Sequence, residues 1–461
     1  METNANSLFL KYTSPKNINS KYSIMGYNRI FSLLFFILVL SIQIFPQQGK
    51  SLKSNNAQVI HAGVMIDVEK GRVVNDVLLV IEKKKIVKID KGSEKTKYND
   101  VIDLSEYTVL PGLIDCHAHL TYNYYDKSID AWELPAASFG ILGAINAKKT
   151  LQAGFTTVRN LHANYYSDVA LRDAINSNWT EGPRMYVSGA ALTITGGHAA
   201  WGNWMSPQLE LRQNPGSVVD GENEVRKEVR KHIKNGVNVI KLMATGGFGT
   251  TGTIPGATSF TFEEIRTAVE EAEKRGLKVA AHAHGADGIK NAIKAGVHSI
   301  EHATFLDKES IELMIKHKVY LTMDLLAAHW DLFEEDQDYS DKEIDLDNKE
   351  MYEKLTNNFN LAYKEGVKMA FGTDSGIYPH GRNAEQFNLM VKAGMTEIDA
   401  IKSATIIAAE LIGIEDNTGS IEEGKWADII AVKGNPLEDI TVLENVEFIM
   451  REGKVHKNNI K

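Results

Sequence analysis

Short β-branched runs alternate with amphipathic stretches through the middle of the chain. Apolar, β-branched runs of strand length alternating with helical periodicity predict parallel strands joined by helices. Eight such units favour closure into a (β/α)8 TIM barrel, with a doubly wound open sheet as the alternative. The predicted strands lie in residues 109–120, 156–160, 185–189, 237–243, 277–283, 297–303, 319–323 and 367–374.

The stretches between these runs carry helix signals. Residues 262–274 place Ile265 and Val269 on one face, and Thr261 with Glu264 forms a capping-box pattern at the start. Several strands are preceded by a glycine where a helix must end and the chain must turn, a position that favours the left-handed conformation. These glycines are Gly154, Gly236, Gly276, Gly296 and Gly366.

Both ends of the chain differ from the middle, because their patterns predict strands without helices between them. Residues 58–67 begin the first β-rich stretch, and residues 427–434 and 446–456 form the second. Two strand-rich ends around an α/β centre predict that the termini pair into one small β-sandwich. The predicted domains are a β-sandwich part at 51–110, the hydrolase barrel at 111–415, and the second β-sandwich part at 416–461.

The first 50 residues have the character of a targeting segment. Arg29 precedes a nearly unbroken apolar run over residues 30–44, which is short for a membrane span and typical of a signal-peptide core. Met1 or Met25 is the start, and an uncleaved N-terminal anchor is the alternative to a signal peptide. The sequence therefore predicts an exported protein, periplasmic or extracellular, with membrane association only if this segment is retained.

Composition narrows the class of protein. Hydrophobic residues make up 43% of the 461 residues and charged residues 24%, which is typical of a globular protein with a large core. A net charge of -9 argues against nucleic-acid binding, because no basic excess is present to neutralise phosphates. The single cysteine, Cys116, excludes an intramolecular disulfide, and we expect it to fill a buried position on a strand.

Polar side chains occupy the carboxyl ends of the predicted strands. His117 and His119 are two apart on one strand, so both side chains point the same way. Because the carboxyl ends of barrel strands meet at one mouth, such residues are expected to converge. Burying them without partners would cost several kcal/mol each, so the pattern predicts a metal site rather than core packing. The candidate ligands are His117, His119, Lys241, His282, His302 and Asp374.

These segments resemble the amidohydrolase superfamily. The matching motifs are PGLIDCHAHL, TTVRN, IKLMATGG, AHAHG, SIEHA and GTDSG, and the resemblance runs from about residue 57 to the end. It implies that the six candidates hold two divalent metal ions and that Lys241 is carboxylated and bridges them. Zinc suits these nitrogen and oxygen ligands, with Mn, Co or Fe as alternatives. A salt bridge to a neighbouring carboxylate is the other interpretation of Lys241.

The predicted chemistry is hydrolysis of a carbon–nitrogen bond. A metal pair lowers the pKa of water to about 7, which provides hydroxide at neutral pH. Asp374 is placed to act as general base and then as general acid toward the leaving nitrogen.

Within the superfamily the sequence is most similar to imidazolonepropionase-like proteins of the Xaa-Pro and Xaa-Arg/Lys dipeptidase group. That similarity implies substrate contacts from His198, after the third strand, and from His284, where relatives often have tyrosine and where a supporting hydrogen bond is the alternative. Arg159 ends the second strand and is a candidate for binding a substrate carboxylate. The alternative for Arg159 is a structural ion pair inside the barrel.

The expected substrate is a small molecule, either a dipeptide or an N-acyl amino acid. A cyclic-amide hydrolase or deaminase is the second hypothesis, but Gly285 stands where a deaminase carries glutamate. A catalytically dead binding protein is the third, although each candidate ligand is in place. Residues 193–225 and 331–350 are candidate lids, and the oligomeric state is open, a homo-oligomer included.

Overall fold

The computed structural model describes residues 57–124, 134–200, 202–206, 216–333 and 344–460. The predicted targeting segment at 1–50 lies outside the described residues, as do parts of both candidate lids. Residues Lys53–Lys461 form one compact unit. The domain boundaries within that unit stay a prediction.

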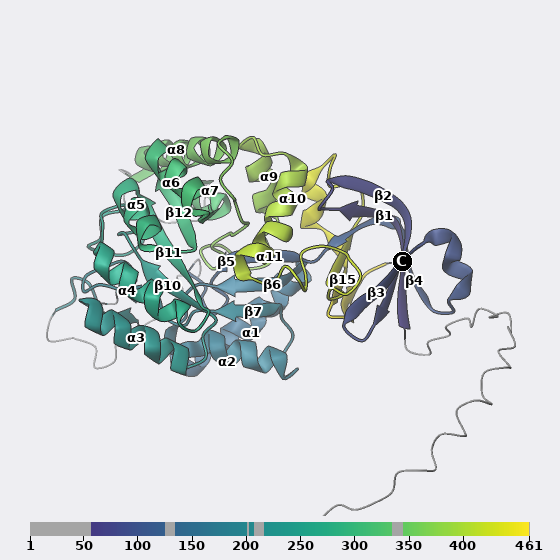
Figure 1. Ribbon diagram of the computed structural model, residues 1–461, viewed down its shortest axis with the longest axis horizontal. Helices are drawn as coiled ribbons and strands as arrows, with labels where there is room; N and C mark the ends of the chain where they lie inside the picture. The colour runs from purple at the N-terminus through teal and green to yellow at the C-terminus, as the bar shows by residue number, and fades with distance from the viewer. Residues whose placement is uncertain (1–56, 125–133, 201, 207–215, 334–343, 461) are drawn as a thin grey trace, which may run out of the picture. The chain divides into compact units, whose positions relative to one another are not determined.

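Parallel strands surrounded by helices form the larger part of the molecule (Figure 1). One sheet has six strands in the order β13-β12-β11-β10-β8-β9, and a second has three in the order β5-β6-β7. The α/β class is therefore confirmed. The strands are β5 (Leu113–Ala118), β6 (Phe155–Asn160), β7 (Arg184–Val187), β8 (Leu192–Thr193), β9 (Ser217–Val218), β10 (Val239–Met243), β11 (Lys278–Gly285), β12 (Ser299–Phe305) and β13 (Tyr320–Thr322).

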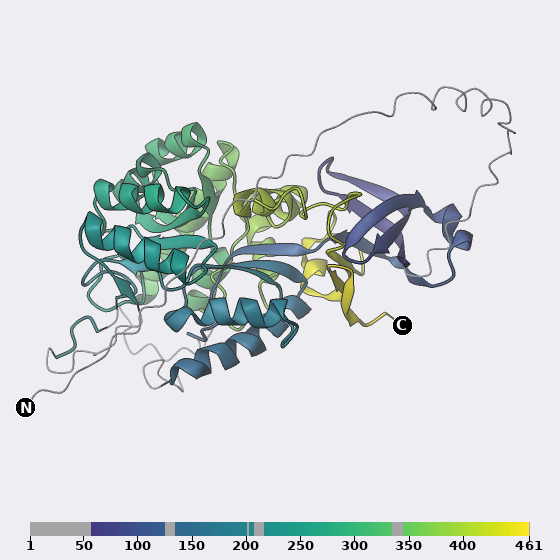
Figure 2. The same ribbon diagram turned by 60° about the horizontal axis from the view of Figure 1, so that its bottom comes forward.

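Helices follow the strands as the periodicity predicts, and α1 and α2 lie beside β6 and β7 (Figure 2). The capping box of α4 is formed, because Thr261 accepts from the Glu264 amide and Glu264 accepts from the Thr261 amide. All five predicted glycines have positive φ. The helices are α1 (Ala136–Gln152), α2 (Ser167–Asn176), α3 (Glu222–Lys234), α4 (Phe262–Glu273), α5 (Ala286–Ala295), α6 (Lys308–His317), α7 (Leu325–Phe333), α8 (Ile344–Lys364), α9 (Glu385–Lys392), α10 (Glu397–Ser403) and α11 (Ile406–Ile412).

The eighth predicted run, residues 367–374, differs from the others because it makes one isolated β-bridge, between Met369 and Leu321, instead of a strand. Backbone hydrogen bonds nevertheless connect it to β13 on one side and β5 on the other, and a further bond connects β7 with the residue before β10. These bonds run from Ala370 N to Leu321 O (2.9 Å), from Cys116 N to Phe371 O (2.8 Å) and from Asn238 N to Val187 O (2.7 Å). The strand pairing of the described residues defines separate sheets, and closure into a barrel stays a prediction.

Both chain ends combine in a seven-stranded sheet, where purple and yellow strands lie together in Figure 1. Its order is β16-β15-β14-β4-β1-β2-β3, and β14 pairs antiparallel with β4. The described residues pair into one sheet here, so the second layer of the predicted sandwich stays a prediction. The strands are β1 (Ala57–Asp67), β2 (Arg72–Glu82), β3 (Lys85–Lys91), β4 (Val101–Pro111), β14 (Ile429–Val432), β15 (Val446–Arg451) and β16 (Lys454–Asn458).

The predicted first run, residues 109–120, is divided between two sheets. Its first residues end β4 in the seven-stranded sheet, and β5 begins after Gly112. A Cβ at Gly112 would lie 2.3 Å from Thr156 Oγ1, so the crossing requires glycine. Cys116 is fully buried on β5, as expected.

An ion pair network connects the three-stranded parallel sheet to the terminal sheet. Arg184 on β7 donates to Asp428 (2.9 Å) and to Glu452 (2.9 Å), and its guanidinium lies 3.9 Å from the Trp426 ring centroid. Because Asp428 is buried, this contact fixes the C-terminal strands against the strand layer that carries the site.

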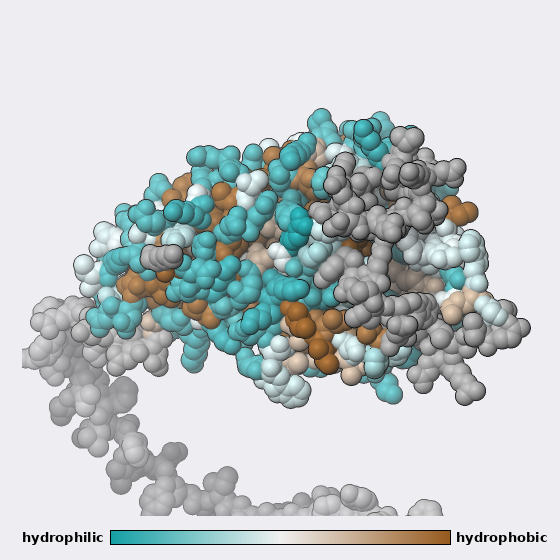
Figure 3. Space-filling model, turned by 180° about the vertical axis from the view of Figure 1, so that it is seen from behind, coloured by the Kyte–Doolittle hydropathy of each residue, from teal (hydrophilic) through white to brown (hydrophobic). Residues whose placement is uncertain are grey.

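Hydrophilic residues predominate on the face shown in Figure 3, and apolar residues occur there in separate patches. Among the described helices, none has the length and apolar character needed to cross a membrane.

Candidate active site

The predicted ligands converge at the carboxyl ends of the parallel strands. His117 lies on β5, Lys241 on β10, His282 on β11 and His302 on β12, while Asp374 is the last residue of the eighth run. The structure thus brings together residues that are separated by more than half of the chain.

Ring contacts and ion pairs show how closely they approach. His119 Nε2 lies 2.7 Å from Asp374 Oδ1, and His117 Nε2 lies 3.5 Å from the same oxygen. The ring centroids of His117 and His302 are 4.9 Å apart, and those of His282 and His302 are 4.5 Å apart.

Several of these polar atoms are buried without a hydrogen-bond partner in the described part of the chain. They include Lys241 Nζ and His282 Nε2. Burying an unsatisfied polar atom costs free energy, so native proteins rarely retain one without a ligand or a chemical role.

Two groups of side chains have the spacing for a metal ion. His282, His284 and His302 form one, and His117, His302 and Asp374 form the other, with the ligand atoms of each group within 4.8 Å of one another. Imidazole nitrogen and carboxylate oxygen are the donors that zinc accepts in proteins. The described residues therefore fit a metal centre.

Burial sets the protonation states that such a centre needs. It lowers the pKa of His117 to about 4 and the pKa of Lys241 to about 8. Burial alone would raise the pKa of Asp374, but the neighbouring His117 and His119 hold it well below its usual value. At neutral pH, His117 is therefore neutral and Asp374 ionised, and part of the Lys241 population is an unprotonated amine.

The outer ring nitrogens of several histidines have hydrogen-bond partners that fix the rings. His117 Nδ1 lies 3.1 Å from Glu301 Oε2, and His302 Nδ1 lies 2.8 Å from Asp324 Oδ1. A carboxylate at Nδ1 orients the ring and leaves Nε2 with its lone pair for a metal. Neither Glu301 nor Asp324 was predicted as a site residue from the sequence.

Arg159 lies inside the strand layer with its donors occupied. Its Nη2 donates to both Glu301 carboxylate oxygens, at 2.8 and 3.0 Å, and its Nη1 donates to Ser299 Oγ at 2.9 Å. It is only 3% exposed. These contacts are those of the structural ion pair that was the alternative for this residue, and substrate binding by Arg159 stays a prediction.

The two other predicted substrate contacts lie next to the candidate ligands. The His198 ring stacks on His282 with centroids 4.5 Å apart, and His284 Nδ1 lies 2.8 Å from Thr304 Oγ1. Both histidines are thus adjacent to the place where chemistry is expected, although their roles stay predictions.

A second layer of aromatic residues lies beside His119. His162 accepts from the Ala191 amide at Nδ1 and lies 3.3 Å from Tyr122 Oη through Nε2. His380 Nε2 lies 2.9 Å from the Tyr122 carbonyl oxygen. These residues support one wall of the site and were not assigned a role from the sequence.

Comparison with known proteins agrees with this geometry. The amidohydrolase family model matches residues 108–457, so the chain belongs to the amidohydrolase family. An ochratoxinase from Aspergillus niger is 34% identical over 442 residues, which cover 91% of this chain and 90% of that protein. An imidazolonepropionase from Fusobacterium nucleatum is 23% identical over 383 residues, covering 77% of this chain and 85% of that one.

Among solved structures, a Xaa-Pro dipeptidase with methionine bound in its active site is 40% identical. It has a TM-score of 0.83 and is matched over 87% of this chain and 100% of its own. The family resemblance predicted from the motifs is thereby confirmed, and the chain is a hydrolase of amide-type bonds by its relatives.

Proposed function

We propose that this protein is a two-metal amidohydrolase that cleaves the amide bond of a dipeptide or an N-acyl amino acid. The observation that carries the proposal is the convergence of His117, His119, His302 and Asp374 on one buried place, with an ion pair of 2.7 Å within it. Relatives named for dipeptide and ochratoxin hydrolysis support the choice of an amide substrate. We also propose that the strands close into a (β/α)8 barrel through residues 367–374.

Each metal position has its own set of ligands in this proposal. His117, His119 and Asp374 would hold one ion and His282 and His302 the other, and Lys241, as a carbamate, would be a ligand shared by both. The lowered pKa of Lys241 supports this, since a carbamate forms from the unprotonated amine. A bridging carbamate also removes the repulsion that an ammonium group would suffer beside two cations. Zinc suits these ligands best.

When bound, the metals supply Lewis acidity toward the carbonyl and lower the pKa of water. Asp374 orients the attacking water, takes its proton at a carboxylate oxygen, and delivers that proton to the leaving nitrogen. The pKa of Asp374, held well below its usual value by His117 and His119, keeps the carboxylate ionised at neutral pH. His198, whose ring stacks on His282, lines the same place and is proposed to contact the substrate.

Export is proposed on the sequence alone, because residues 30–44 have the character of a signal-peptide core.

A substrate screen tests the proposed activity. Purified zinc-loaded protein is incubated with dipeptides, N-acyl amino acids, imidazolones and lactones, and the released amine or acid is measured by mass spectrometry. We expect turnover of dipeptides or N-acyl amino acids, and loss of nearly all turnover in Asp374→Asn with its zinc content retained. Turnover restricted to imidazolones or lactones would favour the cyclic-amide hydrolase instead, and full activity of Asp374→Asn would exclude the role of that residue.

A further inference from the structure

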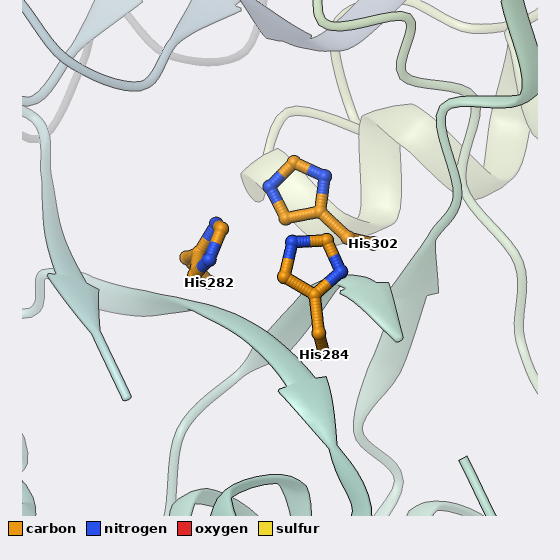
Figure 4. A group of neighbouring side chains, drawn as sticks. All are labelled: His282, His284 and His302. Atoms are coloured by element: carbon orange, nitrogen blue, oxygen red, sulfur yellow. The ribbon is translucent and has the colours of Figure 1, made fainter. Parts of the chain in front are cut away.

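Three imidazole rings face one another at the carboxyl ends of β11 and β12, as Figure 4 shows for His282, His284 and His302. His282 and His284 are two apart on β11, so both project from the same face of the strand. Ring centroids are separated by 4.6 Å between His282 and His284 and by 4.9 Å between His284 and His302. One ring nitrogen of each lies within 4.8 Å of those of the other two.

Hydrogen bonds to the outer nitrogens orient two of these rings alike. His302 Nδ1 lies 2.8 Å from Asp324, and His284 Nδ1 lies 2.8 Å from Thr304 Oγ1. An imidazole that donates through Nδ1–H has an unprotonated Nε2, which is the form that binds a metal. Figure 4 shows the opposite ring nitrogen of His284 facing the space between His282 and His302.

Burying these three imidazole rings together costs free energy unless they share a bound cation. His282, His284 and His302 are each less than a tenth exposed, and His282 Nε2 has no hydrogen-bond partner in the described part of the chain. Three ring nitrogens grouped in one buried space are costly to leave without partners, whereas a divalent cation can accept a lone pair from each. Together with the proposed Lys241 carbamate, three histidines would give this ion four protein ligands, the number that zinc usually takes.

We propose that His284 is a third imidazole ligand of the metal ion held by His282 and His302, with Thr304 as the residue that orients it. The inference rests on the proposed function, because it assumes that His282 and His302 hold a metal there. It gives His284 a role different from the substrate contact implied by the family resemblance.

Zinc affinity of the full-length protein tests the proposal without reference to activity. Metal-free wild type, His284→Gln and Thr304→Val are titrated with Zn²⁺ against a chromophoric chelator, and bound zinc per chain is counted by plasma mass spectrometry. We expect wild type to hold two equivalents. Loss of an outer hydrogen-bond partner typically weakens metal affinity about 10–100-fold, which is the expected effect of Thr304→Val on one equivalent. His284→Gln should weaken the same equivalent by at least the upper end of that range.

His198→Gln is the matched control. Its ring lies as close to His282 as those of the proposed ligands, with centroids 4.5 Å apart, but it is outside the group of three. We expect His198→Gln to keep wild-type zinc affinity at both positions. X-ray absorption at the zinc edge should show fewer imidazole ligands per zinc in His284→Gln and the wild-type number in His198→Gln.

The outcomes separate this inference from the proposed function. If His284→Gln binds both equivalents with wild-type affinity and raises only KM, His284 contacts substrate alone and the inference is wrong. An equal loss in His198→Gln and His284→Gln would mean a general packing effect, which also overturns it. A wild type that holds two zinc ions but cleaves no amide contradicts only the proposed function. Equal melting temperatures of the metal-free proteins verify that the variants fold, and Thr304→Val, which keeps the imidazole, gives an independent test.

Discussion

Replacing Arg159 tests whether this residue stabilises the fold through its buried ion pair with Glu301 or binds the substrate. Arg159→Met keeps much of the side-chain volume but removes the cation that donates two hydrogen bonds to Glu301, at 2.8 and 3.0 Å. Glu301 is fully buried, so its carboxylate would be left without its main counter-charge. Removing one partner of a buried pair costs about 3–5 kcal/mol, and we expect a loss of stability of that size.

The pKa of Glu301 gives the sign of the pH dependence. Burial alone would raise it, but Arg159 and the hydrogen bond with His117 hold it below its ordinary value. A carboxyl group with a lowered folded-state pKa stabilises the protein above its unfolded-state pKa of about 4.3 and loses that contribution as the pH falls toward the folded-state value. The difference between wild type and Arg159→Met should therefore be full at pH 7 and shrink below about pH 4.3.

Urea unfolding at pH 7 measures the effect as a shift in midpoint at unchanged slope. Arg266→Met is the control, because Arg266 forms an exposed i,i+4 pair with Glu270 that is worth less than about 1 kcal/mol. In the double variant Arg159→Met/Glu301→Gln no buried charge is left unpaired, so the two losses should not add. A wild-type midpoint for Arg159→Met together with a raised KM would refute this reasoning and restore Arg159 as a substrate-binding residue.

Three further substitutions test the site and the fold. Gly247→Ala would place a Cβ 2.6 Å from His282 Nε2 and 2.8 Å from His198 Nε2, so both rings must move. A displacement of about 1 Å at such a site can cost about 10²-fold, which is the expected loss in kcat/KM. Wild-type kinetics would contradict this placement of the two rings. Lys241→Ala should lower bound zinc per chain and abolish hydrolysis, and intact hydrolysis would exclude the bridging role. Thr261→Ala removes the hydroxyl that caps α4 and should cost about 1 kcal/mol in urea unfolding without changing kcat.

Much of the architecture follows from local pattern. Strand runs, the α4 capping box and helix-ending glycines such as Gly296 depend on interactions between residues close together in the sequence. The structure contains the capping box and the left-handed Gly296 as predicted. The eighth run differs because it makes a single isolated bridge, between Met369 and Leu321, rather than a ladder of paired residues. Whether a run becomes a regular strand depends on the register of its neighbours, which periodicity does not encode.

Glu301 and Asp324, the carboxylates that bond to His117 and His302, could not be assigned their partners from sequence position. Asp324 lies two residues beyond Thr322, the last residue of β13, so its place near a strand end could have marked it as a candidate. Its contact with His302 depends on how β12 and β13 are aligned, and that alignment is a tertiary property. Glu301 is harder to assign, because a buried glutamate beside a histidine in sequence gives no sign that it bonds to His117 on β5.

Backbone strain explains how neighbouring residues on β12 serve the same centre. Side chains one apart on a strand normally point to opposite faces, yet Glu301 bonds to His117 and the His302 ring lies 4.9 Å from the same His117 ring. His302 has a φ of +73°, outside the strand region, so the alternation ends at this residue. Asp374 likewise has a φ of +56°. Such conformations cost about 1–3 kcal/mol each in residues other than glycine and persist where the surroundings hold them. Two of the proposed ligands, His302 and Asp374, carry this strain, and at His302 it lets two successive residues, Glu301 and His302, both approach His117.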